Sequence, residues 1–590
     1  MAVPRHVARS ASQLFLLDKE SPQYKAYLAI ADIPHPDRAI LGAFIENASD
    51  SEKAAQFFLR WTSEAEGDGS ELPPKKAVLR FLSDWKLILN TFRPVVATSL
   101  SDEEKKLIFA RDGGQCCITQ TPFNGYLAKG LEYAHIAPPT AFIRSPDLSR
   151  GGHLFDILSS FIPHKLLDTF LSQKNGNMDK LDNILLLSKT TFCAFQKGAV
   201  YLELQTWAKD TDISLKRSYS AYTNNFVPPD CDRLYLPSRT VHVVNRTPES
   251  TPIVSEELLT FHAHLSSSLA WMEAERYMLR SLSDCSKAST LTSPAAQSQV
   301  EVTKKSPVTR LITSFLSIFH GLWKSFPSFV RAPVYDVLVW IGSRMYGPTL
   351  SATNHKLPFG LYLRRGSPSL APKYHVEAHT LKMIEQSTDI PAPRAIDVTQ
   401  TSRYSYLLMT CVPGHPIGPS LNTMTDEEVE QVVVDLKGYI SELRKIPRDS
   451  SSKYLICNSQ GGGFLDWRIP DSQSEELRFK SEADFNKYLT GPFWEEIRIR
   501  AAKSHDTPHD IVFTHGDLNP RNILAENGRI TGIVDWENAG WFPEYWEYTK
   551  MHYTVRSLER WLVDVVDSVF PGYREELWVE NMLSDLLGPF

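Results

Sequence analysis

The hydrophobic and polar positions in the first half of the chain follow two different patterns. Apolar side chains recur every three to four residues in Ser51–Trp61, Lys75–Leu87 and Ser255–Leu282, which is the spacing that lines one face of an α-helix. Between these segments, Ile108–Leu204 carries shorter apolar runs separated by Gly, Pro and Cys. The pattern predicts helices whose aromatic residues lie in a core, around a region of shorter elements.

In the second half, predicted strands alternate with predicted helices. Val334–Tyr346 and Tyr374–Gln386 have the apolar spacing of helices. Pro358–Arg365, with Gly360 early in it, and Tyr404–Cys411 are short apolar runs of the kind that form strands. Strands followed by a long helical remainder predict a small sheet lobe and a larger helical lobe.

Two segments near the middle of the chain have unusual composition. Asp284–Pro307 is rich in Ser, Thr, Ala and Lys and has almost no large apolar residue. Because such a segment cannot bury enough surface to offset its ordering entropy, it predicts a disordered linker.

Leu311–Trp323 is an uncharged apolar stretch, shorter than the roughly 20 residues that span a bilayer. We interpret it as a buried or interfacial helix.

Composition and charge narrow the class of protein. The chain has 590 residues, of which 42% are hydrophobic and 22% are charged, which excludes a wholly disordered or collagen-like chain. The net charge of −6 supplies no global basic field for nucleic acid, so such binding would need a local patch. Seven Cys, a sparse and odd number, favour a reducing compartment. Since no secretory signal begins the chain, we expect an intracellular protein, cytoplasmic or nuclear, with no transmembrane segment and no membrane partner.

The clearest chemical signal lies in Val512–Glu547. Asp517 and Asn522 are five residues apart, and Asn527–Gly528 separates two short apolar runs, which is typical of a β-hairpin. The second run ends in Asp535. A tight hairpin would bring Asn522 and Asp535 to one end of the sheet, with Asp517 on a loop just before them.

These three residue types suit phosphoryl transfer. A carboxylate can accept the proton of an attacking hydroxyl, while an amide oxygen and a second carboxylate can hold Mg²⁺, which favours hard oxygen ligands. Protein kinases use the same D-x-x-x-x-N spacing, followed by a metal-binding Asp. Because this reaction depends mainly on positioning and on metal charge, the trio points to an ATP- and Mg²⁺-dependent phosphotransferase.

The segment HGDLNPRNIL…GIVDWENAGWFPEYWE resembles the aminoglycoside phosphotransferase and choline kinase group, in the version common in filamentous fungi. The resemblance extends back through LPFGLYLRRG, VEAHTLKMIEQSTDIPAPRAIDV, YLLMTCVPGHPIG and GGGFLDWR, and covers most of Val334–Phe590. It implies a two-lobed protein-kinase-like fold that binds ATP and Mg²⁺ between its lobes. It also implies that Asp517 is the catalytic base and that Asn522 and Asp535 are metal ligands.

The same resemblance assigns two residues to nucleotide binding. Glu377, in VEAHTL, would be the helix acid that orients the phosphate-binding cation. The family usually has Lys for that cation, whereas this chain has Arg364 at the best-matching position. Arg is longer, planar and forked, so nucleotide affinity and turnover are expected to differ. The acceptor is expected to be a small-molecule hydroxyl of unknown identity.

A second resemblance covers roughly Lys105–Glu203. RDGGQCCIT, EYAHIAP and DNILLLSKTTFCAF resemble the HNH endonuclease module of fungal proteins, which has a ββα-metal fold. The resemblance implies that His135 is the general base for water and that Asn183 orients it. Phe192 stands where the family has a metal-binding His, and a phenyl ring cannot ligate a divalent cation. We therefore expect the nuclease chemistry to be lost.

Cys116 and Cys117 lie within this second region and are adjacent in the sequence. Adjacent cysteines lack the C-x₂-C spacing of zinc sites. Since free Cys is readily buried, we interpret the pair as small buried residues.

These expectations combine into an α+β multidomain chain. The predicted parts are a helical N-terminal region (1–100), an HNH-like module (101–210), a helical extension (211–283), a disordered linker (284–307) and a kinase-like domain (308–590). The expected partners are ATP and a small-molecule acceptor. Two alternatives stay open: an HNH-type metal-dependent endonuclease acting on nucleic acid, and a non-catalytic nucleotide-binding pseudokinase scaffold.

Overall fold

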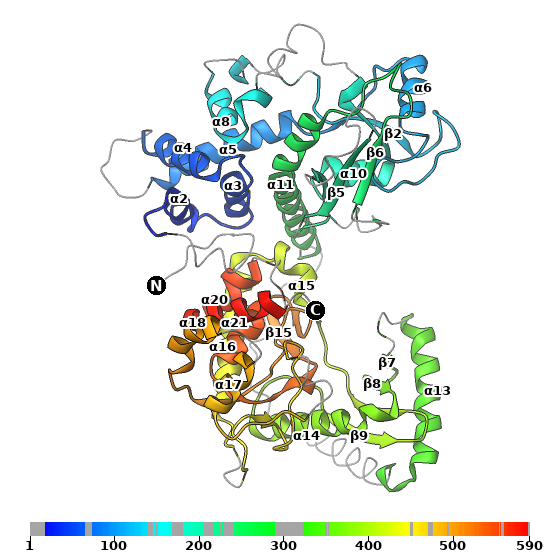
Figure 1. Ribbon diagram of the computed structural model, residues 1–590. Helices are drawn as coiled ribbons and strands as arrows, with labels where there is room; N and C mark the ends of the chain where they lie inside the picture. Colours follow the sequence, from blue (N-terminus) through cyan, green and yellow to red (C-terminus); the bar gives the residue numbers. More distant parts are fainter. Residues whose placement is uncertain are drawn as a thin grey trace. The chain divides into compact units, whose positions relative to one another are not determined.

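The chain divides into two compact units, Met1–Ala288 with Ser557–Arg560, and Ser289–Arg556 with Trp561–Phe590. The computed structural model describes residues 18–587, except 65–72, 140, 142–145, 149–151, 168–180, 206–215, 225, 229–230, 232–235, 237–239, 290–322, 348–350, 352, 449–451, 470–475, 492–494, 554, 556–557, 559 and 571. Both units combine helices with antiparallel sheets (Figure 1). The expected α+β class is confirmed.

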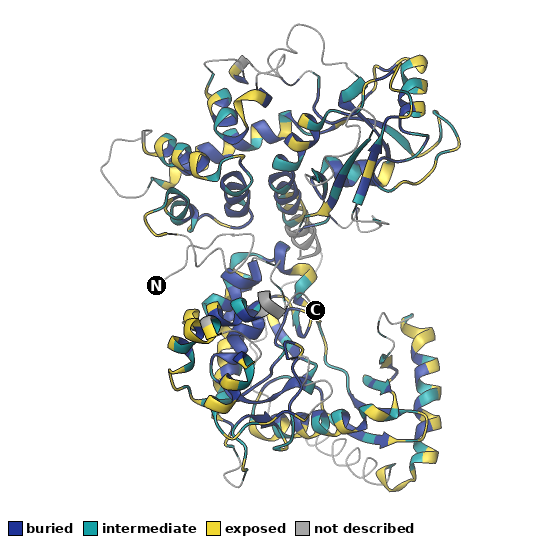
Figure 2. Cartoon of the chain, viewed as in Figure 1, coloured by how far each residue is buried: buried dark blue, intermediate teal, exposed yellow. Residues whose placement is uncertain are grey.

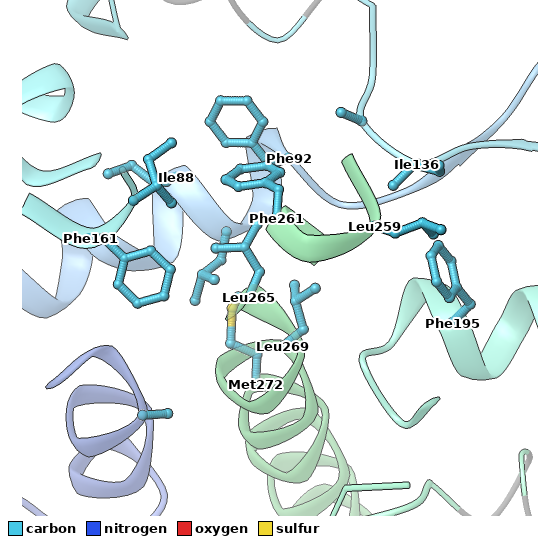
Figure 3. Close-up of a cluster of buried hydrophobic side chains, with 14 of the residues drawn as sticks. Ile88, Phe92, Ile136, Phe161, Phe195, Leu259, Phe261, Leu265, Leu269 and Met272 are labelled. Carbon is cyan, nitrogen blue, oxygen red and sulfur yellow. The ribbon is translucent and has the colours of Figure 1, made fainter. Parts of the chain in front are cut away.

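Helices of the first unit pack around one hydrophobic core. They are α2 (Pro22–Ile30), α3 (Asp37–Glu46), α4 (Ser51–Glu64), α5 (Lys75–Thr91), α6 (Asp102–Arg111), α8 (His153–Phe161), α10 (Lys189–Gln196) and α11 (Glu256–Ser289). The three segments with helical periodicity correspond to α4, α5 and α11, so those helices are confirmed. Figure 3 shows part of the core, where Phe92 and Phe161 lie around Leu265 and Leu269 of α11.

Two antiparallel sheets complete the described part of the first unit. Their orders are β1-β2-β3 and β4-β5-β6, with β1 (Val95–Val96), β2 (Leu131–His135), β3 (Ile184–Ser188), β4 (Val200–Leu204), β5 (Lys216–Thr223) and β6 (Thr240–Val244). β2 pairs with β3, and α10 follows β3 directly. The order β2–β3–α10 is that of a ββα unit, but its identity as an HNH-like module stays a prediction.

His262 of α11 is buried in this core against Phe195. The two rings stack at a centroid distance of 3.6 Å, and the His262 Nε2–H donates to the Phe195 carbonyl oxygen at 2.8 Å. Nδ1 is buried and has no hydrogen-bond partner among the described residues. Burial lowers the pKa of His262 to about 4, because this environment cannot solvate a charged imidazole.

We expect this histidine to make the first unit less stable in mild acid. The unfolded chain binds a proton at His262 near its ordinary pKa of 6.5, whereas the folded chain binds one only near pH 4. The stability present above pH 6.5 is therefore lost as the pH falls toward 4. Between pH values of about 7 and about 5 the loss is about 2 kcal/mol. Hydrogen exchange of α11 amides in urea at both pH values measures it, and an equal pH dependence in His262→Phe would contradict the assignment.

A four-stranded antiparallel sheet forms the small lobe of the second unit. Its order is β7-β8-β10-β9, with β7 (Asn354–Leu357), β8 (Leu361–Gly366), β9 (Ala395–Gln400) and β10 (Ser405–Thr410). α13 (Ser328–Tyr346) packs on this sheet through Tyr335 and Val339, and α14 (Ala371–Ser387) packs against β9 and β10. Both helices were predicted, although α13 begins six residues earlier than Val334.

The predicted strand Pro358–Arg365 needs a correction at its start. Phe359 and Gly360 have φ values of +63° and +67°, which lie in the left-handed region and end a strand. Pro358–Gly360 is therefore the turn of a hairpin between β7 and β8. The strand β8 begins only at Leu361.

The large lobe of the second unit contains two small antiparallel sheets and several helices. Their orders are β11-β14-β15 and β12-β16-β13, with β11 (His415–Pro416), β12 (Cys457–Asn458), β13 (Ile511–Thr514), β14 (Ile523–Glu526), β15 (Arg529–Ile533) and β16 (Gly540–Pro543). Its helices are α15 (Ile417–Ser420), α16 (Asp426–Lys445), α17 (Glu482–Thr490), α18 (Glu495–His505), α19 (Trp546–Tyr553), α20 (Asp567–Val569) and α21 (Arg574–Leu587). Short 3₁₀ turns in the described chain include η1 (Pro146–Leu148), η3 (Leu181–Asn183), η5 (Pro368–Leu370), η6 (Leu421–Thr423) and η8 (Trp536–Asn538). The segment η9 (Trp561–Val566) is a π-helix. The predicted division into a sheet lobe and a helical lobe matches this arrangement.

The predicted linker Asp284–Pro307 also needs a correction. α11 continues to Ser289, because the residues from 284 to 289 include no Gly or Pro to end a helix. Residues 290–307 of the linker and 311–322 of the apolar stretch lie outside the described residues. Among the helices that the structure describes, none is long and apolar enough to cross a membrane.

Candidate active site

The β14–β15 hairpin positions two of the three predicted phosphotransfer residues. Asn527 and Gly528 have φ values of +50° and +72°, as a two-residue hairpin turn requires. At the open end of the hairpin, the Val534 N–H donates to the Asn522 carbonyl oxygen at 2.9 Å. Asn522 therefore lies beside Val534, one residue before Asp535.

Asp517 lies on the loop between β13 and β14, in contact with Asn522. Asn522 Nδ2 donates to the Asp517 carboxylate oxygen Oδ2 at 3.0 Å and to the Asp517 carbonyl oxygen at 2.8 Å. Burial raises the pKa of Asp517; Lys550 opposes this shift and Asp535 adds to it. The structure thus brings Asp517, Asn522 and Asp535 together.

His515 ties this loop to the end of the hairpin. Its Nδ1 accepts the Asp517 backbone N–H at 3.2 Å, and its Nε2 lies 3.0 Å from the Val534 carbonyl oxygen. Since a carbonyl can only accept, Nε2 carries the proton. Burial lowers the pKa of His515. A neutral ring with this tautomer holds Asp517 next to the strand that leads to Asp535.

Glu547 of α19 holds the backbone of the same loop. Its Oε2 accepts the His515 N–H at 2.6 Å, and its Oε1 accepts the Gly516 N–H at 3.2 Å. Gly516 has a φ of +77°, and a Cβ there would lie 2.4 Å from the Asn538 carbonyl oxygen. Both the buried carboxylate and the glycine are therefore required for the path of the chain into Asp517.

Arg364 of β8 forms ion pairs with three carboxylates. Its Nη1 contacts Glu377 Oε2 at 2.7 Å and Asp535 Oδ1 at 3.0 Å. Its Nη2 contacts Glu537 Oε2 at 2.6 Å. The structure therefore places Arg364 beside Glu377, as the resemblance implied, and also connects the small-lobe sheet to Asp535 of the large lobe.

The three carboxylates carry more negative charge than one guanidinium can neutralise. Burial raises the pKa of Glu377 to about 7, although Arg364 opposes the shift. Burial likewise raises the pKa of Glu537. This excess of negative charge favours a further cation at the site.

A cavity of about 360 Å³ opens between the two lobes of the second unit. Its lining includes Arg364, Glu377, Asn522 and Asp535, together with the apolar side chains of Met409, Val412 and Leu524. Apolar walls with a few convergent polar groups are typical of small-molecule sites, which have volumes of about 300–1,000 Å³. Four of the predicted site residues therefore face one cavity.

The donor atoms at this cavity suit a hard divalent cation. Asp535 has a left-handed φ of +68°, and its side chain is 37% exposed. Asn522 adds an amide oxygen, and oxygen donors are what Mg²⁺ prefers. In the described part of the chain, no three His, Cys, Asp or Glu side chains converge as a metal site. A metal here would therefore rely on Asn522 as well as on Asp535.

Several residues at the site were not predicted from the sequence. Glu537 follows Asp535 by two positions, and Glu547 and Lys550 lie on the next helix. Lys356 of β7 lines the cavity, and its Nζ lies 4.9 Å from the centre of the Tyr346 ring. Lys356 pairs with Tyr362 on the neighbouring strand, and both residues line the cavity, a placement that only the structure shows.

The residues predicted for an HNH-like site lie together in the first unit. Asn183 Nδ2 lies 3.5 Å from His135 Nδ1, and it donates to the Ala137 carbonyl oxygen at 2.8 Å. Both side chains are buried. Phe192, at the position of the missing metal ligand, is buried in α10. The predicted base and orienting residue are thus adjacent, and their roles stay predictions.

Cys116 and Cys117 point to different partners. The Cys116 thiol lies 3.6 Å from Thr191 Oγ1, whereas the Cys117 thiol lies 3.3 Å from Asp112 Oδ2. Burial raises the pKa of the Cys117 thiol well above its usual value. A buried protonated thiol is a poor metal ligand, in agreement with the interpretation as small buried residues.

Comparison with known proteins found matches to part of the second unit. Residues 353–578 match the family model described as the phosphotransferase enzyme family. An aminoglycoside 3'-phosphotransferase of Escherichia coli is 25% identical over 186 residues, which are 31% of this chain and 65% of that protein. A hygromycin-B 4-O-kinase of Escherichia coli is 22% identical over 26% of this chain and 45% of its own length. The chain therefore spans less than two thirds of these relatives.

The solved structures are covered over a larger share of their own length. A macrolide 2'-phosphotransferase of Brachybacterium faecium is 18% identical, covers 43% of this chain and 90% of its own, and has a TM-score of 0.28. A GDP and kanamycin complex of an aminoglycoside phosphotransferase is 14% identical, covers 43% of this chain and 90% of its own, and has a TM-score of 0.30.

Proposed function

We propose that residues 353–578, which match the family model described as the phosphotransferase enzyme family, transfer the terminal phosphoryl group of ATP to a small-molecule hydroxyl. The observation that carries the proposal is the convergence of Asp517, Asn522 and Asp535 at the end of one hairpin. The relatives described above are kinases of aminoglycosides and hygromycin B. For this chain we propose only the class of acceptor, a small molecule with a free hydroxyl.

On the donor side, Asn522 and Asp535 would hold Mg²⁺ through an amide oxygen and a carboxylate. When bound, the metal neutralises charge on the phosphates. Arg364 would contact those phosphates from β8, and Glu377 keeps its guanidinium in place from α14. Because Arg364 also contacts Asp535, the guanidinium competes with a metal ion for this carboxylate.

On the acceptor side, Asp517 would take the proton of the attacking hydroxyl at its carboxylate. Asn522 orients that carboxylate through its amide group. Burial raises the pKa of Asp517, which makes it a stronger base than an exposed aspartate. His515 and Glu547 hold the backbone on which Asp517 is carried.

The proposal predicts that Mg²⁺-ATP stabilises the second unit. A ligand present at about 100 times its Kd adds about 2.7 kcal/mol of stability. For a domain of this size each kcal/mol raises Tm by about 2–4 °C, so we expect a rise of roughly 5–10 °C in differential scanning calorimetry. Asp535→Ala should abolish the Mg²⁺-dependent part of this rise.

The matched control for this measurement is Asp506→Ala, which removes an exposed carboxylate after α18. It should keep the full rise in Tm. No change in Tm of the unaltered protein at millimolar Mg²⁺-ATP would count decisively against nucleotide binding. Stabilisation without phosphoryl transfer to any acceptor would instead favour a pseudokinase scaffold.

For the first unit we propose an HNH-like fold without nuclease activity. Phe192 supports this proposal, because no metal-binding side chain stands at its position. Plasmid cleavage in the presence of Mg²⁺, Mn²⁺ or Zn²⁺ that disappears in His135→Ala would favour the endonuclease alternative.

A further inference from the structure

The outward face of α13 carries large apolar side chains from Phe329 to Tyr346, interrupted near its end by Ser343 and Arg344. Its most exposed large side chains include Phe329 at 74%, Trp340 at 57% and Val337 at 56%. Other exposed apolar residues of the helix and of the turn before it are Phe326, Val330, Val334, Met345 and Tyr346. Figure 2 shows exposed residues along α13, between others in the colours of intermediate and buried residues. An exposed apolar surface of this kind marks an interaction site.

The opposite face of α13 already holds the helix on the small-lobe sheet. Tyr335 and Val339 are buried against that sheet. Arg331 forms an ion pair with Asp397 of β9, and Asp336 pairs with Arg365 of β8 at 3.1 Å. The contacts that hold α13 on the small-lobe sheet therefore do not involve the outward face of the helix.

The charges around the apolar face are mainly positive. Lys324 and Arg344 are exposed near its two ends, whereas the one carboxylate between 324 and 346, that of Asp336, is 44% exposed and paired with Arg365 of β8. The guanidinium of Arg344 lies 4.5 Å from the centre of the Trp340 ring. Over 304–346 the sequence has six Lys or Arg and one Asp, and that Asp is turned toward β8.

From these observations we propose that α13 docks on the surface of an anionic lipid bilayer. Apolar and aromatic side chains with Lys and Arg at the edges are the composition of helices that lie in a membrane interface. Long basic side chains reach phosphate headgroups while the apolar side chains enter the acyl region. The helix does not cross the bilayer. This inference differs from the expectation of no membrane partner.

A second copy of the chain is a less suitable occupant of the same face. Symmetric pairing would bring the Lys324 end or the Arg344 end of one copy against a cationic end of the other. The one carboxylate of the helix, Asp336, is already paired with Arg365 of β8. An anionic bilayer neutralises both cations, whereas a second copy neutralises neither.

Vesicle flotation of the full-length chain tests the proposal. We expect binding to vesicles that contain phosphatidylserine, weak binding to pure phosphatidylcholine vesicles, and release by high salt. Val337→Glu should weaken binding to the anionic vesicles by about tenfold or more. The matched control is Val434→Glu on α16, because Val434 has the same exposure of 56% and lies outside the proposed surface.

The other outcomes overturn the proposal. If the unaltered chain does not bind anionic vesicles, or binds neutral vesicles equally well, anionic lipid is not the partner. A dimer in light scattering that Val337→Glu dissociates, without vesicle binding, would make the face a self-association surface. Vesicle binding that appears only after deletion of residues 308–322 would show that the chain itself covers α13. Because Val337 is remote from the phosphotransfer residues, Mg²⁺-ATP stabilisation of Val337→Glu confirms that the variant is folded.

Discussion

Asp517→Asn is expected to slow phosphoryl transfer from ATP by roughly 10²–10⁴-fold, the contribution of a general base. The substituted amide keeps an oxygen that can accept the hydrogen bond from Asn522 Nδ2. It cannot take up the proton of an attacking hydroxyl at neutral pH, since an amide oxygen is far less basic than a carboxylate. The change should therefore remove the base and leave the surrounding loop in place.

Transfer of labelled γ-phosphate measures this effect, with a metabolite extract as the source of acceptors and with ATP hydrolysis as a second readout. Mg²⁺-ATP stabilisation should persist in Asp517→Asn, because the proposed metal ligands Asn522 and Asp535 are unchanged. Asp506→Asn serves as the control and should retain full activity. Unchanged transfer in Asp517→Asn would show that Asp517 is not the base, even if nucleotide binding stands.

Lys550→Met is expected to cost the second unit about 3–5 kcal/mol of stability, as breaking one side of a buried ion pair usually does. Lys550 Nζ lies 2.9 Å from Asp466 Oδ1, and both side chains are only 1% exposed. Trp546 Nε1 also donates to the Asp466 carboxylate at 3.1 Å. The Trp546 contact is neutral, and another nearby cation, Arg468, lies farther away, with Nε 3.9 Å from Asp466 Oδ1. Neither replaces the ammonium that this buried carboxylate loses.

Urea unfolding of the unaltered chain and the variant measures this loss. The control is Lys503→Met, since Lys503 pairs with Glu575 at the same 2.9 Å but with 77% and 61% of the two side chains exposed. An exposed pair contributes about 0–1 kcal/mol, so this control should be almost neutral. If both variants lose equal stability, burial is not the cause. Adding Asp466→Asn to Lys550→Met should restore part of the stability, because it removes the buried charge that Lys550 had neutralised.

The same ion pair connects the core of the large lobe to the proposed base. Lys550 lowers the pKa of Asp517 in opposition to burial. Replacing the ammonium should therefore raise the pKa of Asp517 further. In Lys550→Met the acid limb of the pH–rate profile should move to higher pH, a shift that a purely structural role for Lys550 would not produce.

The local part of the candidate site could be predicted from the sequence. An Asn-Gly pair between two apolar runs specifies a two-residue hairpin turn, and that hairpin sets Asn522 beside Val534. Asp517 and Asn522 are only five positions apart, so a short loop suffices to bring them into contact. The amphipathic helices were likewise predictable, because side-chain periodicity reports directly on one buried face. The ends of helices and strands were not predictable, as the later start of the strand β8 and the extension of the helix α11 demonstrate.

The sequence by itself determined the chemistry of the hairpin, since turn geometry and short loops depend on neighbouring residues. Only the tertiary structure decided that Arg364 contacts Asp535 and Glu537, which lie 171 and 173 residues further along the chain. It also decided which residues of α13 are exposed, because that helix is apolar on more than one side and the sheet covers only one of them. Contacts of this kind depend on how the lobes pack, and no local pattern of residues records that packing.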